Sequence, residues 1–146
     1  MYESVLDLHS YLAYGVLVFL LLATLNSFIG LSSQRPFIPR DRKIAMIALI
    51  FTHVQFVIGL LVVFGNNPRF KAATSGGMKT LMNSENRPLF IEHPLINLIA
   101  IILITIGWSK HKKAVDPGHK FKSIAIFYAI GLVLLLSRIP YGQWFD

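Results

Sequence analysis

The chain contains no cysteine and few charged residues. Without cysteine it can form no disulfide, no thiolate metal site and no thioether-linked haem. Charged residues make up only 14% of the 146 residues, and 54% of the residues are hydrophobic. Soluble domains contain about 25% charged residues, and here the charges are confined to short segments between long apolar runs. This composition excludes an ordinary soluble domain.

Long apolar runs are what the chain has instead. A helix needs roughly 20 apolar residues to cross a bilayer core of about 30 Å. The runs of this kind are Leu8–Leu31, Ile44–Phe64, Leu89–Trp108 and Phe121–Leu136, the last extended to about residue 140 by Ile139, Pro140 and Tyr141. Membrane strands alternate apolar and polar residues, and these runs do not. The sequence therefore predicts an all-α membrane protein, in which residues 1–146 form a single transmembrane domain that is a four-helix up-down bundle.

The positive charges predict an orientation in the membrane. Nine of the 14 Lys and Arg residues lie in two short segments, Ser32–Lys43 and Ser109–Lys122. Since basic loops stay on the cytoplasmic side, both termini of this multi-pass protein are expected outside. The third connection, Gly65–Pro88, is long enough to fold over the outer mouth of the bundle. Residues Met1–Leu8 carry no Lys or Arg, so no signal peptide is expected.

The same distribution limits the partners. The net charge of +7 is a topology signal that also attracts anionic lipid, so the lipid bilayer is the expected partner. Nucleic-acid binding is not expected, because no soluble basic domain carries the charge. Nothing in the sequence suggests a nucleophile, a pair of catalytic carboxylates or a phosphate-binding loop, so independent enzymatic activity is not expected either.

Small and polar residues indicate which helix faces look inward, since they favour close helix packing in a membrane. They form one stripe along each predicted helix, and simple packing explains the Ala and Gly residues. The stripes are His9, Ala13, Val16, Leu20, Ala23, Ser27 and Gly30; then Ala45, Ala48, Thr52, Gln55 and Gly59; then His93, Asn97, Ala100, Ile104 and Gly107; and, more weakly, Tyr128, Gly131, Leu135 and Arg138. Two of the stripes carry a histidine.

His9 and His93 are the leading candidates for cofactor ligands. Each lies near the outer start of its helix, so the two are at similar depth, and the first and third helices of an up-down bundle are diagonal. Two histidines placed in this way can clamp a planar ring from both faces, which is the geometry of a bis-histidine haem. Ala13 and Ala100 would leave room beside the ring, and Asn97 could orient a ligand. In the alternative, each histidine only hydrogen-bonds a headgroup or a loop carbonyl.

Other polar residues are secondary candidates. Arg87 and Arg138 lie on the outer side and could pair with haem propionates, or be ordinary interfacial arginines. His53 lies near the midplane, roughly 10 Å below the other pair by helical rise. It could be structural, serve with Gln55 in a quinone site or proton path, or ligate haem in another pairing. His111 and His119, in the basic segment, are expected to be solvated side chains without function.

Several short motifs carry a family resemblance. They are Leu8-His9-Ser10, Thr52-His53-Val54-Gln55-Phe56-Val57-Ile58-Gly59-Leu60, Glu92-His93-Pro94 and Leu103-Ile104-Thr105-Ile106-Gly107. Over nearly its whole length the chain resembles short four-helix bacterial membrane proteins named cytochrome B or cytochrome b-like. It is more distantly similar to one half of haem A synthase, which implies ligands at His9 and His93. The chain lacks the second half and the Glu-x-x-His pattern of that enzyme, so haem A synthesis is not implied.

The favoured function is therefore a b-type cytochrome. It would bind one haem b near the outer face and carry electrons within, or into, a respiratory complex, with quinone and other subunits of the complex as partners. The alternative is a cofactor-free structural or assembly subunit of a larger membrane complex. A small transporter or channel is disfavoured, because the spans contain no acidic residue other than Glu92 near the start of the third, and no broken helix pair.

Overall fold

The computed structural model describes residues 1–144, and these residues form helices and loops but no strand. The elements are α1 (Tyr2–Ser32), α2 (Pro39–Phe64), α3 (Pro68–Ser75), α4 (Gly77–Leu81), the π-helical turn η1 (Pro88–Glu92), α5 (His93–Lys113), α6 (Pro117–Ser137) and α7 (Tyr141–Trp144). Four helices, the third comprising η1 and α5, are long and apolar enough to cross a membrane. The prediction of an all-α, four-helix membrane bundle is confirmed.

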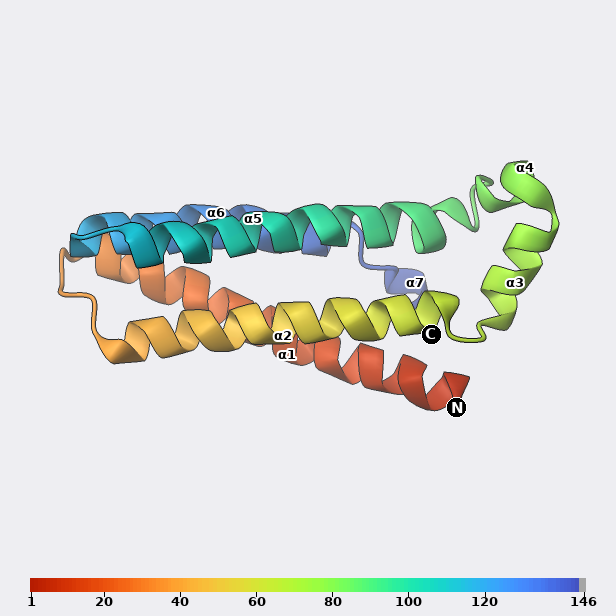
Figure 1. Ribbon diagram of the computed structural model, residues 1–146, viewed down its shortest axis with the longest axis horizontal. Coiled ribbons are helices and arrows are strands. Elements are labelled where there is room, and N and C mark those ends of the chain that lie inside the picture. Colours follow the sequence, from red (N-terminus) through yellow and green to blue (C-terminus); the bar gives the residue numbers. More distant parts are fainter. Residues whose placement is uncertain (145–146) are drawn as a thin grey trace.

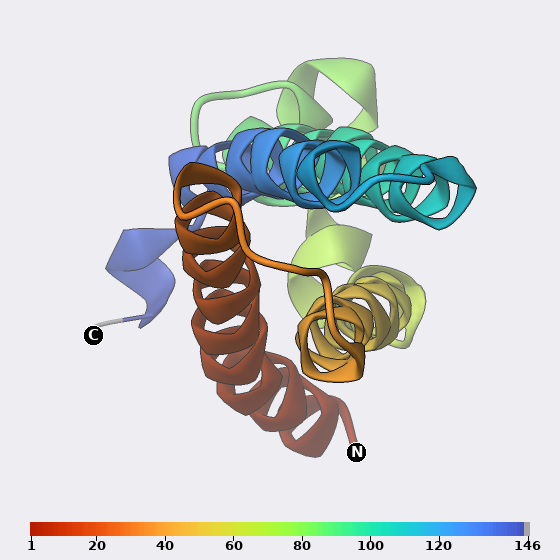
Figure 2. The ribbon, with the colours of Figure 1, turned by 90° about the vertical axis from the view of Figure 1, so that its left-hand side faces the viewer.

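The four long helices run up and down along one axis (Figure 1). The loops after α1 and after α5 lie at one end, called here the short-loop end. Both termini, α3 and α4 lie toward the other end, called the terminal end (Figure 1). Seen along the axis, α1 packs on α2 and α6, and α5 packs on the same two helices (Figure 2). As predicted, α1 and α5 therefore occupy diagonal corners.

The helix boundaries differ from the predicted spans. Hydropathy detects only the apolar part of a helix that crosses the bilayer, and the helix can continue beyond that part. α1 already begins at Tyr2, with Glu3 in its first turn, where a carboxylate favours the helix dipole. The predicted extension of the last span to residue 140 is wrong, since α6 ends at Ser137. Pro140 has no backbone N–H and disfavours helical geometry at the residue before it, so the chain leaves α6 and re-forms as the short α7.

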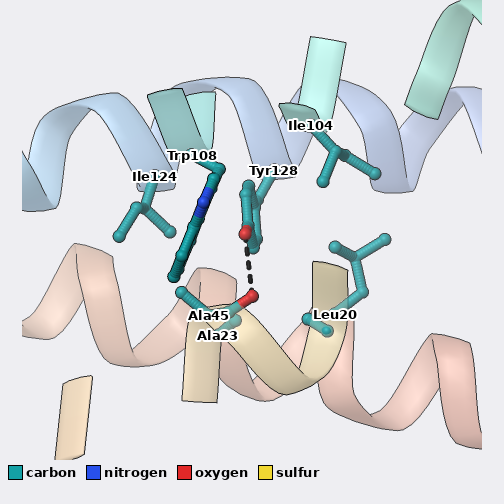
Figure 3. Close-up of a cluster of buried hydrophobic side chains, with 8 residues drawn as sticks. Leu20, Ala23, Ala45, Ile104, Trp108, Ile124 and Tyr128 are labelled. Carbon is teal, nitrogen blue, oxygen red and sulfur yellow. Dashed lines mark hydrogen bonds between the residues drawn. The ribbon is translucent and has the colours of Figure 1, made fainter. Parts of the chain in front are cut away.

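The closely packed core lies between the middle of the bundle and the short-loop end, as the positions of its residues along the four helices show. It combines small residues with large apolar ones from all four helices: Leu20, Ala23, Ala45, Ala48, Ile104, Trp108, Ile124 and Tyr128. The Tyr128 hydroxyl donates a hydrogen bond of 2.8 Å to the carbonyl of Ala45, which links α6 to the diagonal α2 (Figure 3). Gly131 lets α5 and α6 approach, because a Cβ there would lie 2.6 Å from Ile104. The small-residue stripes predicted from the sequence thus face inward.

A buried ion pair holds the loop between α1 and α2 against the first turn of α2. The Arg35 guanidinium donates two hydrogen bonds of 2.8 Å to the Asp41 carboxylate, which is 1% exposed and also accepts bonds from Asn26 and the Ile38 backbone. These hydrogen bonds with Asp41 raise the pKa of Arg35. Arg35 also lies over the Phe121 ring at 4.8 Å. The loop therefore joins α1, α2 and α6 at the short-loop end.

The prediction that His111 is a solvated side chain is wrong. α5 continues to Lys113, so His111 stays on the helix and is only 2% exposed. Its Nδ1 lies 2.6 Å from the Trp108 carbonyl, and its ring packs against Trp108 and Phe37. His119 is exposed as predicted and pairs with Asp116, the N-cap of α6, whose pKa it lowers by hydrogen bonding.

Candidate cofactor site

A cavity of about 580 Å³ occupies the terminal half of the bundle. It exists because α6 ends early and because α1 diverges from α6 toward its N-terminus (Figure 1). Residues from all four long helices line it, together with the start of α3, η1 and the segment after α6. Its volume lies within the range of cofactor and ligand pockets, about 300–1,000 Å³. The long connection between α2 and α5 reaches the cavity through Asn67, Pro68 and Arg69.

The side chains of His9 and His93 meet in this cavity. Their ring centres are 6.2 Å apart and their planes are inclined at 85°. The matched depth predicted for these two diagonal residues is thus present in the structure. Two metal–imidazole bonds of about 2.1 Å, with about 1.1 Å from each nitrogen to its ring centre, would separate the centres by about 6.4 Å. The observed spacing therefore suits a metal centre held between two imidazoles.

His93 is held in one tautomer by its surroundings. Its Nδ1 lies 2.7 Å from the backbone carbonyl of Arg138. Nδ1 therefore carries the ring proton and donates a hydrogen bond to that carbonyl. The lone pair is then on Nε2, which accepts a hydrogen bond of 3.1 Å from the Asn97 amide. Metal-binding histidines are usually fixed by such a bond to a carbonyl. The π-helical turn η1 leads directly into His93, and such turns are rare and often found at functional sites. The backbone N–H of His93 donates a hydrogen bond to the Pro88 carbonyl.

His9 is placed by two residues of α2. The Gln55 amide donates a hydrogen bond of 2.8 Å to the backbone carbonyl of His9. Gly59 provides the space for the ring, because a Cβ at that position would lie 3.0 Å from His9 Cε1. Gln55 and Gly59 were predicted to face inward on the same stripe, and both line the cavity.

The residues that line the cavity carry unpaired buried polar atoms. Within residues 1–144, the buried side-chain nitrogen and oxygen atoms that lack a hydrogen-bond partner are His9 Nδ1, Gln55 Oε1 and Asn97 Oδ1. All three residues line this one cavity. A buried polar atom without a partner is costly and calls for a ligand, an ion or water. The cavity is thus the candidate place for a ligand, an ion or water that would pair with these atoms.

The positions of Arg87 and Arg138 fit the interfacial role among their two alternatives better than the pairing with propionates. Arg87 and Arg138 flank the Glu92 carboxylate at 3.8 and 4.0 Å, and neither is among the residues that line the cavity. The arginine that lines it is Arg69, whose guanidinium donates a hydrogen bond of 2.9 Å to Gln143 of α7. Arg69 is one of the basic residues outside the two basic segments, and the sequence predicted no site role for it. The pattern Asn67-Pro68, an N-cap followed by proline at the first helical position, was the available signal for a helix there.

His53 lies apart from this site. It is exposed on the outside of the isolated bundle, with Nδ1 2.8 Å from the Leu49 carbonyl and Nε2 3.3 Å from the Thr105 hydroxyl. It does not line the cavity, whereas Gln55 does, so the two residues do not share one site. The hydrogen bond to Thr105 of α5 fits the structural role among the alternatives for His53.

The ligating side chains at the cavity limit the kind of metal centre that it could hold. In the part of the chain that the structure describes, no group of three or more His, Cys, Asp or Glu side chains could hold a bare metal ion. A pair of histidines instead suits a metal that arrives with equatorial ligands of its own.

Comparisons with known protein families, with characterised proteins and with solved structures find no match. The functional inference therefore rests on the geometry of the site.

Proposed function

We propose that the chain is a membrane-bound b-type cytochrome that holds one haem b between His9 and His93. The observation that supports this most directly is the spacing of 6.2 Å between two imidazoles on diagonal helices, at a cavity lined by the three residues that carry the unpaired buried polar atoms. The residues fit the group, since porphyrin supplies four equatorial nitrogens and needs only two axial ligands from the protein. When bound, haem would supply reversible one-electron redox chemistry, and the protein would carry electrons within or into a respiratory complex.

The side chains of the site have separate tasks in this proposal. The Arg138 carbonyl accepts a hydrogen bond from the Nδ1–H of His93, which orients the ring and makes Nε2 a stronger electron-pair donor. Asn97 holds that Nε2 as an acceptor and must release it for a metal. Gly59 and Gln55 fix the position of His9 from α2. The apolar side chains of the lining, such as Val16, Ile101 and Leu135, keep water away and lower the local dielectric, which tunes the redox potential.

The test is spectroscopic and redox. The protein is expressed with an adequate haem supply, extracted in mild detergent, and measured oxidised and dithionite-reduced. We expect about one haem per chain, a sharp α-band on reduction and a one-electron potentiometric titration. A fully inserted protein without haem absorption would overturn the proposal. Under that outcome the cofactor-free structural or assembly subunit becomes the better reading.

The orientation belongs to the same proposal. We place the short-loop end in the cytoplasm of a bacterial cell, with both termini and the cavity toward the outer side of the inner membrane, because the basic segments lie at the short-loop end. A periplasm-dependent reporter fused to the C-terminus should be active, and the same reporter inserted at Val115 should be inactive. The reverse pattern would place the cavity on the cytoplasmic side.

A second candidate is a quinol site in the same cavity. The observation in its favour is that two of the unpaired atoms, Gln55 Oε1 and Asn97 Oδ1, are acceptors, which suit the hydroxyl donors of a quinol. A purified protein that retains quinone but no haem, and loses the quinone on Gln55→Leu substitution, would favour this candidate over the cytochrome.

A further inference from the structure

We propose that Arg69 is the anion-binding residue of the cavity and that it binds a carboxylate of the cavity ligand, which under the proposed function is a haem propionate. The inference rests on the proposed function, and it assigns a task to a residue outside the four long helices. It follows from how Arg69 is held, from its present partner, and from the other charges around the cavity.

The backbone that carries Arg69 is fixed to the end of α2. Asn67, which is 3% exposed, caps α3 by accepting hydrogen bonds from the N–H groups of Arg69 at 2.9 Å and Phe70 at 3.2 Å. The Asn67 amide also donates a bond of 2.9 Å to the Val62 carbonyl in the last turn of α2. Arg69 is thus tied to the bundle, although it lies in the long connection.

The present partner of Arg69 is neutral. Its guanidinium donates to the side-chain oxygen of Gln143, and within residues 1–144 no carboxylate lies within 4.0 Å of it. Arg35, Arg87 and Arg138 each face a carboxylate instead. A charged group that faces a neutral amide keeps its capacity to bind an anion, and an incoming carboxylate oxygen makes a stronger, charge-assisted bond than the amide does.

The other charges around the cavity give the anion one favourable position. Arg69 is the only Lys or Arg among the lining residues of the described chain, whereas Glu3 and Asp7 of α1 are acidic. A ligand carboxylate is therefore attracted to Arg69 and repelled by Glu3 and Asp7, and Gln143 of α7, the present partner of Arg69, also lines the cavity. The geometry therefore points to α3 and α7 as the place where the acid groups of the ligand lie. There a ligand carboxylate would replace Gln143 as the hydrogen-bond acceptor of Arg69.

The experiment compares haem b with its dimethyl ester, in which both propionates are neutral. Affinities of the apoprotein for each compound are measured in the same detergent for the wild type, Arg69→Gln and the control Arg87→Gln. We expect the wild type to bind the free acid about ten- to a hundredfold more tightly than the ester, the range of a charge-assisted hydrogen bond. Arg69→Gln should weaken binding of the acid by that factor and bind both compounds equally, while Arg87→Gln should behave as the wild type does.

Equal affinity of the wild type for acid and ester overturns the inference, as does full discrimination in Arg69→Gln. Arg69→Lys keeps the charge but not the planar fork, and should retain part of the discrimination; it serves if Arg69→Gln does not fold. Failure of the proposed function looks different, because then neither compound binds, or both bind equally well to the His9→Ala variant.

Discussion

The imidazole rings of His9 and His93 lie 6.2 Å apart with their planes at 85°, although His9 belongs to the first membrane span of the sequence and His93 to the third. Each ring is fixed by a different neighbour: Gly59 of α2 gives His9 its space, and the Arg138 carbonyl after α6 accepts a hydrogen bond from the Nδ1–H of His93. All four corners of the bundle thus contribute to one pair of side chains.

The crossed planes predict a specific magnetic signature. If each ring keeps its orientation when iron is bound, the ferric low-spin centre should give the strongly anisotropic electron paramagnetic resonance signal of perpendicular imidazoles. The measurement is a low-temperature spectrum of the oxidised protein. A rhombic signal typical of parallel imidazole planes would show that at least one ring turns on binding.

Gly59 is expected to control the position of His9. Gly59→Val places a branched side chain where even a single Cβ would lie 3.0 Å from the His9 ring, so the ring must move. Residues that orient a metal ligand contribute about 10- to 100-fold to metal affinity, and a loss of that size in haem affinity is expected here. Gly142→Val is the matched control, since a Cβ at Gly142 meets nothing within 4 Å. Unchanged affinity in Gly59→Val would show that His9 is not a ligand in this position.

The two partners of the buried ion pair should not be equivalent. Arg35→Ala leaves the Asp41 carboxylate, 1% exposed, without its counter-charge and should cost about 3 kcal/mol of stability. Asp41→Asn leaves Arg35, whose side chain is 26% exposed and can reach water, so a smaller loss of about 1 kcal/mol is expected. Thermal unfolding in detergent measures both. Equal losses would mean that the carboxylate is solvated after the arginine is removed.

His111 should matter for stability and not for the cofactor. His111→Ala removes a buried ring and its bond to the Trp108 carbonyl, which should cost about 1–3 kcal/mol. His119→Ala, at an exposed side chain, should change stability by less than about 0.5 kcal/mol. Both variants should keep the wild-type haem content and spectrum. A changed spectrum in His111→Ala would connect the short-loop end to the site.

Much of this arrangement follows from the sequence because the bilayer and the helical repeat constrain it strongly. Apolar length gave the four spans, and the small-residue stripes gave their inner faces, so His9 and His93 could be paired without coordinates. The end of α6 could not be read from hydropathy, since Ile139 and Tyr141 are as apolar as a helix interior, and Pro140 decides where the helix stops. That early end opens the cavity.

Residues in loops were harder to predict for a different reason. The burial of His111 depends on Phe37, which a folded loop brings onto it, and Arg35 finds Asp41 only when that loop closes. Arg69 reaches the cavity because Asn67 ties α3 back to α2. These contacts depend on turns and helix caps, which a periodic hydrophobic pattern does not predict. The histidine pair depends only on the depth of each histidine in the membrane and on the order of the helices.

The most direct test is the haem content and reduced spectrum of three variants beside the wild type, each checked for membrane insertion: His9→Ala, His93→Ala and His53→Ala. We predict that the wild type and His53→Ala carry about one low-spin haem per chain with a sharp α-band, and that His9→Ala and His93→Ala each lose most of the haem. A wild-type spectrum retained in both His9→Ala and His93→Ala, or loss of haem in His53→Ala with the others intact, would contradict the ligand pair.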